Sequence, residues 1–165
     1  AEASGSLGPD FTQCVWTLET LETTQQLGQQ LARHLPKRSI LLLQGELGAG
    51  KTSLVQGLAQ ACGITEPITS PTFALAQHYP DGNPPLIHLD LYRLEALGSA
   101  DDLFLQEEEE ARAIGALMAV EWPDRLSLSL PEAWLLNLND APGGGRNATL
   151  HPPTLSNAAE SKNHA

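Results

Sequence analysis

The sequence predicts an α/β fold, in which strands alternate with helices along the chain. A short apolar run at residues 39–44 precedes a glycine-rich stretch, and a helical pattern at residues 53–61 follows it. Elsewhere, apolar runs bounded by Pro, Gly and Asn alternate with helical patterns, which favours strands separated by helices. At 165 residues, the chain is long enough for one domain with a single core.

The region before this apolar run predicts one strand and one helix. Residues 11–18 are rich in β-branched and aromatic side chains, which favour a strand. Thr20 suits a helix N-cap, and Pro36 would stop the helix. The leucines that recur on one face of this helix are Leu27, Leu31 and Leu35.

Residues 45–52, GELGAGKT, fit the phosphate-binding pattern G-x-x-x-x-G-K-[ST] of P-loops. The N–H groups of such a loop surround an anionic phosphate, and the following helix contributes the positive end of its dipole. Lys51 would bridge the outer phosphates, and the Thr52 hydroxyl would help to hold a magnesium ion. We therefore predict a P-loop domain that binds a nucleotide.

Downstream of the P-loop helix, the sequence predicts an extended loop and a β-hairpin. Two prolines bar a regular helix from residues 65–72. Residues 73–79 and 86–94 read as strands on either side of a turn rich in Pro and Gly, so we expect them to pair. The second strand alternates, which predicts one polar face with His88, Asp90 and Tyr92.

The last third of the chain predicts an acidic helix and three short strands. The helix spans residues 95–113 and is broken by Gly115. Buried or half-buried strands are expected at residues 116–122, 133–138 and 147–151.

These elements predict a single P-loop ATPase domain over residues 11–151. The polar ends of the chain, residues 1–10 and 152–165, predict flexible termini. Cys14 and Cys62 show no metal-ligand spacing and fit a reducing cytoplasm.

The chain is strongly acidic, with a net charge of −11 from nine Lys and Arg against twenty Asp and Glu. Affinity for nucleic acid comes mainly from cations that neutralise phosphates, so this chain is not expected to hold nucleic acid by itself. We see no apolar run long enough to cross a bilayer and no secretory signal in the opening residues. A cytoplasmic protein without membrane contact is therefore expected.

Two predicted strands carry a carboxylate that could serve the P-loop, Asp90 and Glu121. P-loop hydrolases need such an acid at the end of a strand beside the P-loop strand. One acid would support magnesium, while the other orients or deprotonates the attacking water. In the structural alternatives, Glu121 is an ordinary strand-end acid and Asp90 bonds Arg93 or a loop hydroxyl.

Other features have both a functional and a structural interpretation. Residues 70–72 could form a nucleotide-dependent switch loop or a bare turn. Trp122 could stack near the nucleotide, although a core position is favoured. The EEEE run at residues 107–110 predicts a solvated helix face more than a docking site for a basic partner, and His78 belongs to no constellation.

Two classes of P-loop protein fit the sequence less well. GTPases use N-K-x-D, whereas residues 137–140 read NLND, and residues 90–93 lack the glycine of D-x-x-G. Small-molecule kinases commonly use several arginines, and the six in this chain are not clustered. A switch-like ATPase fits best. The alternatives are a small-molecule kinase and a nucleotide-dependent binding module without relevant hydrolysis.

Four ordered motifs resemble those of the TsaE (YjeE) family. They are GELGAGKT at 45–52, SPTF at 70–73, HLDLYRL at 88–94 and EWP at 121–123. These bacterial ATPases serve the tRNA threonylcarbamoyladenosine machinery, and the resemblance covers roughly residues 15–150. It implies a three-layer P-loop NTPase-like domain with a mixed β-sheet between helices.

The resemblance also implies function and site residues. The activity would be Mg²⁺-dependent hydrolysis of ATP to ADP, slow alone and stimulated by partners. Lys51, Asp90 and Glu121 would be catalytic, and Thr52 and Glu121 would hold the metal. The nucleotide-binding residues would be Thr20, Leu47, Gly48, Ala49, Gly50, Lys51, Thr52, Ser53 and Arg146. The switch residues would be Ser70, Pro71, Thr72, Tyr92 and Arg93. The partner would be a TsaD–TsaB complex, which transfers threonylcarbamoyl to the adenosine next to the anticodon, so tRNA would be reached only indirectly.

Overall fold

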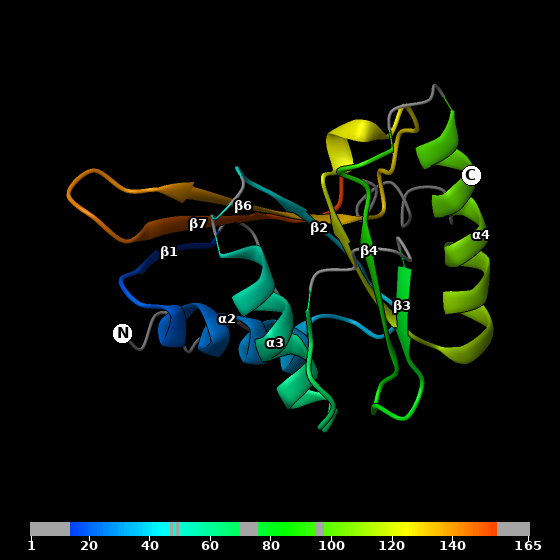
Figure 1. The fold of residues 1–165 in the computed structure, drawn as a ribbon, viewed down its shortest axis with the longest axis horizontal. Helices are drawn as coiled ribbons and strands as arrows, with labels where there is room; N and C mark the ends of the chain where they lie inside the picture. The colour runs from blue at the N-terminus through cyan, green and yellow to red at the C-terminus, as the bar shows by residue number, and fades with distance from the viewer. Residues whose placement is uncertain (1–13, 47, 49, 70–75, 95–97, 155–165) are drawn as a thin grey trace, which may run out of the picture.

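The computed structural model describes residues 14–46, 48, 50–69, 76–94 and 98–154. Within them, seven strands form one mixed sheet in the order β1-β7-β6-β2-β5-β4-β3 (Figure 1). The strands are β1 (Cys14–Leu18), β2 (Ile40–Gln44), β3 (Ala76–Tyr79), β4 (Leu86–Asp90), β5 (Leu117–Glu121), β6 (Trp134–Asp140) and β7 (Arg146–His151). The neighbouring strands β6, β2, β5 and β4 run parallel, whereas β1, β7 and β3 pair antiparallel.

Helices cover both faces of this sheet. They are α2 (Leu21–His34), α3 (Lys51–Ala61) and α4 (Ser99–Ile114), with a short 3₁₀ helix, η1 (Pro123–Arg125). Alternate side chains of β2 point to opposite faces: Leu41 and Leu43 pack in one core cluster with α2 and α3, and Ile40 packs in a second with α4. The predicted three-layer arrangement of a mixed sheet between helices is confirmed.

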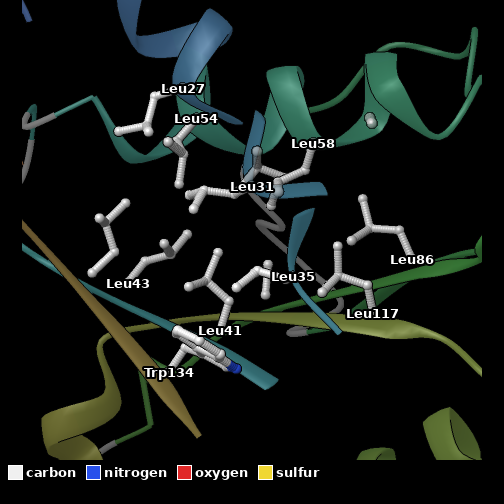
Figure 2. Packing of buried hydrophobic residues seen from close by; sticks show 14 of the residues in the cluster. Leu27, Leu31, Leu35, Leu41, Leu43, Leu54, Leu58, Leu86, Leu117 and Trp134 are labelled. Carbon is white, nitrogen blue, oxygen red and sulfur yellow. The ribbon is translucent and has the colours of Figure 1, made fainter. Parts of the chain in front are cut away.

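The larger core cluster lies between β2 and the helices α2 and α3. Figure 2 shows leucines of α2 and α3 meeting leucines of β2, with Trp134 of β6 beside them. The helical face predicted from leucine spacing is confirmed, since Leu27, Leu31 and Leu35 are all buried. This core fixes α3, and therefore its N-terminus, against the end of β2.

Local signals placed the start of α2 and the end of α4 well, whereas α4 begins at Ser99, four residues after its predicted start. Thr20 is the N-cap of α2 and forms a capping box with Thr23, so two terminal N–H groups have partners. Gly115 ends α4 in a left-handed conformation with φ 71°, which glycine adopts most readily. Helix α3 begins at Lys51, two residues before the predicted start.

Some predicted segments fall outside the described residues. These are residues 11–13 of the first strand, residues 73–75 of the third strand, and the predicted flexible termini apart from residues 152–154. In the part of the chain that is described, no helix is both long and apolar enough to span a membrane.

The polar face predicted for β4 is correct for His88 and Asp90, which alternate along the strand, and wrong for Tyr92. The strand lies between β3 and β5 in the sheet, and His88 has no exposed surface. The strand ends at Asp90, so Tyr92 follows it rather than sharing its face.

The predicted solvated face at residues 107–110 is also wrong at its first position. Glu107 is buried, and its Oε1 lies 2.5 Å from His78 Nε2 on β3. His78 and Glu107 therefore form a pair that links the hairpin to α4, although sequence reasoning gave His78 no partner.

Helices α2 and α3 approach closely at two glycines, Gly28 and Gly57. A Cβ added at Gly57 would lie 2.0 Å from the Gln25 carbonyl oxygen, and one at Gly28 would lie 2.2 Å from the Leu54 carbonyl oxygen. Neighbouring amide side chains also bond across the interface, with Gln25 Nε2 donating to Gln56 Oε1 at 2.8 Å. The helices can pack this closely only where a side chain is absent.

We expect Gly57→Ala to destabilise the fold although alanine favours helix by about 1 kcal/mol. Backbone must shift to admit the methyl group, at a cost of about 1–3 kcal/mol beyond the propensity gain. Urea denaturation measures the free energy of unfolding. Gln26→Ala, at an exposed site on α2, is the control and should change it by less than about 0.5 kcal/mol. A more stable Gly57→Ala variant would contradict the close contact.

Candidate functional site

The P-loop connects the end of β2 to the start of α3. Gly48 and Gly50 have φ values of 81° and 97°, in the left-handed region that L side chains rarely adopt. Gly50 is the N-cap residue of α3, so the first N–H groups of the helix face the loop. The local backbone therefore has the shape that an anion-binding loop requires. Leu47 and Ala49 lie outside the described residues.

The Lys51 ammonium is held inside the loop. Its Nζ donates to the carbonyl oxygens of Gly45 at 2.5 Å and Glu46 at 3.0 Å. Only 6% of the residue is exposed. Burial lowers the pKa of Lys51, while the nearby carboxylates of Glu121 and Asp90 oppose this shift. The site therefore holds a desolvated cation close to two acids.

Asp90 and Glu121 lie level with each other at the ends of neighbouring strands. They are register partners in the parallel pair β4 and β5. Leu86 of β4 and Leu117 of β5 belong to the α2–α3 core cluster, so alternation puts both carboxylates on that same face. The structure thus brings Asp90, Glu121 and Lys51 together, as the sequence predicted.

The two acids differ in their surroundings. Burial raises the pKa of Asp90, and the Tyr92 backbone N–H, which donates to Asp90 Oδ1 at 3.0 Å, partly offsets the rise. The predicted structural partners of Asp90, Arg93 or a loop hydroxyl, are replaced by this backbone group. Glu121 is 3% exposed, and its Oε2 lies 2.6 Å from His88 Nε2.

Sequence reasoning missed His88 as a neighbour of the site. The signal was its position two residues before Asp90 in a strand, which places both side chains on one face. The sequence placed His88 and Asp90 on one polar face, but the spacing within one strand does not show which residue of a neighbouring strand lies beside His88.

Aromatic side chains close one side of the lysine. Lys51 Nζ lies 4.5 Å from the ring centroid of Trp122, and the Trp122 and Tyr92 ring centroids are 4.7 Å apart. Trp122 is half-buried and has φ 62°. It packs against the α4-side core as well, so the core and near-site interpretations both describe part of its surroundings. Arg93 is exposed.

Arg146 reaches the P-loop from β7. Its Nη2 donates to the Gly48 carbonyl at 2.8 Å, and its Nε is buried without a hydrogen-bond partner among the described residues. Thr20 lies one helical turn before Thr24. The Thr24 methyl group is close to the loop, since a Cβ added at Gly50 would lie 3.6 Å from it. The side chain of Arg146 and the start of α2 thus flank the loop.

The remaining predicted site residues have these positions. Thr52 and Ser53 lie in the first turn of α3, where Thr52 is half-buried and Ser53 is buried. Ser70, Pro71 and Thr72 lie outside the described residues.

No group of three or more His, Cys, Asp and Glu side chains in the described residues could by itself hold a metal ion. Mg²⁺ is usually bound by one or two protein oxygens together with waters and substrate phosphates. The Thr52 hydroxyl at the start of α3 and the Glu121 carboxylate at the end of β5 are donors of this kind, so the residues fit such a site.

Comparison with known proteins agrees with this geometry. The family model "Threonylcarbamoyl adenosine biosynthesis protein TsaE" matches residues 18–147. Relatives named tRNA threonylcarbamoyladenosine biosynthesis protein TsaE include one from Synechocystis, 52% identical over 66% of this chain and 69% of its own length. Another, from Nostoc, is 44% identical over 79% of this chain and 81% of its own.

A solved structure has the same fold. The crystal structure of YdiB from Bacillus subtilis superposes with a TM-score of 0.68 at 29% identity, covering 91% of this chain and 90% of that one. The four motifs, the P-loop fold and the match over residues 18–147 lead to one conclusion: the chain belongs to the TsaE family of tRNA threonylcarbamoyladenosine biosynthesis proteins.

Proposed function

We propose that this protein is a Mg²⁺-dependent ATPase, built as one P-loop domain over residues 11–151. The observation that carries the proposal is the buried P-loop lysine, Lys51, beside two register-paired strand-end carboxylates, Asp90 and Glu121. The P-loop lysine by itself would support nucleotide binding but not hydrolysis. Two acids held at the same level add the means to support a metal and to activate water.

Nucleotide binding is assigned to the P-loop and its two flanks. The N–H groups of residues 47–53 would surround the phosphates, with Lys51 leaving its loop carbonyls for the outer phosphate oxygens. Arg146 supports this assignment because its Nε–H is buried without a described partner beside the loop. Thr20 lies at the start of α2, two residues after Leu18, which is the register partner of Arg146.

Thr52 and Glu121 would hold the magnesium ion, which when bound neutralises charge on the phosphate oxygens. Asp90 would orient the attacking water and accept its proton. A raised pKa suits this role because it makes the carboxylate a better base. The Tyr92 N–H fixes one oxygen of Asp90, which leaves the other for water.

The segment after Asp90, with Tyr92 and Arg93, would form part of the switch. Tyr92 contacts Trp122, and the Trp122 ring contacts the Lys51 ammonium. A shift of residues 92–93 would therefore change the contacts of Lys51 at the phosphate site. Ser70, Pro71 and Thr72 would complete the switch. Within the described residues, Arg146 is the arginine that donates a hydrogen bond to the P-loop. We expect ATP turnover to be slow in the isolated protein and to be stimulated by partner proteins.

The proposed role is that of a cytoplasmic switch subunit. A TsaD–TsaB complex would transfer threonylcarbamoyl to the adenosine next to the anticodon, and ATP hydrolysis here would support that cycle. The net charge of −11 agrees with tRNA being held by the partners.

We expect ATP hydrolysis to rise when TsaD–TsaB is added, and Lys51→Ala and Glu121→Ala to lose about 10²–10³-fold of the stimulated rate. Lys37→Ala, at an exposed site before the start of β2, is the control. Free phosphate as the product supports an ATPase. A phosphorylated acceptor would instead indicate a small-molecule kinase, and full activity in Lys51→Ala would refute the proposal.

We expect Asp90→Asn to bind ATP, lose hydrolysis and gain thermal stability at pH 7. Since the folded pKa of Asp90 is raised, its ionised form is disfavoured in the folded state, and this cost is present above the folded pKa. Asparagine keeps the acceptor for Tyr92 N–H. Melting temperatures should therefore exceed wild type at neutral pH and converge as the pH falls below the Asp90 pKa. Retained hydrolysis in this variant would exclude Asp90 as the base.

A further inference from the structure

We propose that His88 is a positioning residue that fixes the Glu121 carboxylate for its metal-side role. This inference rests on the proposed function, which assigns Glu121 but says nothing of what holds it. The carboxylate lies at the end of β5 with 3% of the residue exposed, and His88 on β4 has no exposed surface. Their closest atoms, His88 Nε2 and Glu121 Oε2, are 2.6 Å apart.

The sheet register explains how the ring reaches the acid. His88 is the register partner of Ala119, and Asp90 is the register partner of Glu121. The imidazole thus extends along β5 by two residues, over a position that carries only a methyl group. Both members of the pair lie on rigid strands in the middle of the sheet, which hold a side-chain geometry better than loops do.

The hydrogen-bonding pattern indicates which nitrogen of the His88 ring carries the proton. His88 Nδ1 is buried and has no hydrogen-bond partner among the described residues. With the proton on Nε2, the ring donates to Glu121 and Nδ1 is a bare acceptor, so no N–H is left unpaired. In this tautomer, Oε2 of Glu121 is occupied and Oε1 remains for a metal ion or its water.

A purely structural role predicts a different outcome. Replacing a whole buried polar pair with apolar groups often costs little stability, but removing one partner leaves the other unpaired and destabilises the fold. If His88 serves only the stability of the fold, leucine should lower the free energy of unfolding and leave the Mg²⁺ dependence of ADP binding unchanged. If His88 orients Glu121, leucine should also weaken ADP binding in Mg²⁺.

The test measures ADP binding by calorimetry in Mg²⁺ and in EDTA. In His88→Leu, the Kd for ADP in Mg²⁺ should rise about tenfold, at the low end of what loss of such a supporting residue costs. The Kd in EDTA should not change, which also shows that the P-loop is folded. The Mg²⁺ effect is the decrease in the Kd for ADP between EDTA and Mg²⁺. His88→Gln places an amide donor near the position of Nε2 and should recover most of this effect.

Two further variants make the outcome specific. His78→Leu removes the exposed histidine of the other His–Glu pair, which links β3 to α4, and should leave the Mg²⁺ effect intact. Glu121→Gln should abolish the effect, and adding His88→Leu to it should change nothing more. If Glu121→Gln abolishes the effect but His88→Leu does not, the positioning role is overturned and the proposed function stands. If Glu121→Gln has no effect, both the metal role of Glu121 and the inference fail.

Discussion

The parallel register of β2, β5 and β4 is the constraint on which the site depends. Glu121 is the register partner of Leu43, one residue before β2 ends, and Asp90 is the register partner of Glu121. The carboxyl ends of parallel strands meet at one edge of the sheet, where ligands of open α/β sheets bind. A shift of one residue in β5 would turn Glu121 to the α4 face and remove it from Lys51.

This arrangement concentrates charge where the protein can least solvate it. Burial lowers the pKa of Lys51 even though Glu121, Asp90, Asp124 and Glu46 all act to raise it. Asp90 is likewise disfavoured as an anion. A lowered lysine pKa beside a raised aspartate pKa is typical of functional sites, where charged groups serve a ligand at a cost to the stability of the fold. The apolar core between α2, α3 and the sheet has to offset that cost.

Local signals were enough to predict the P-loop, the N-cap of α2 and the end of α4, because each depends on residues a few positions apart. Gly50, Thr20 and Gly115 are examples. The burial of Glu107 depended on distant packing and was mispredicted, and the partners in both His–Glu pairs were missed: His78 and Glu107 are 29 residues apart, and His88 and Glu121 are 33 apart. No spacing rule joins such pairs.

Trp122 connects the P-loop lysine with Tyr92, which is proposed to belong to the switch. It directly follows Glu121, and its left-handed backbone, with φ 62°, is a conformation that a bulky residue keeps only when its surroundings enforce it. Here the surroundings are Lys51 on one side and Tyr92 on the other. Tyr92 in turn donates its N–H to Asp90. Lys51, Trp122, Tyr92 and Asp90 are therefore connected through direct contacts, and Glu121 through its peptide bond to Trp122. In the proposed switch, a movement of residues 92–93 would change the packing of Trp122 against Lys51.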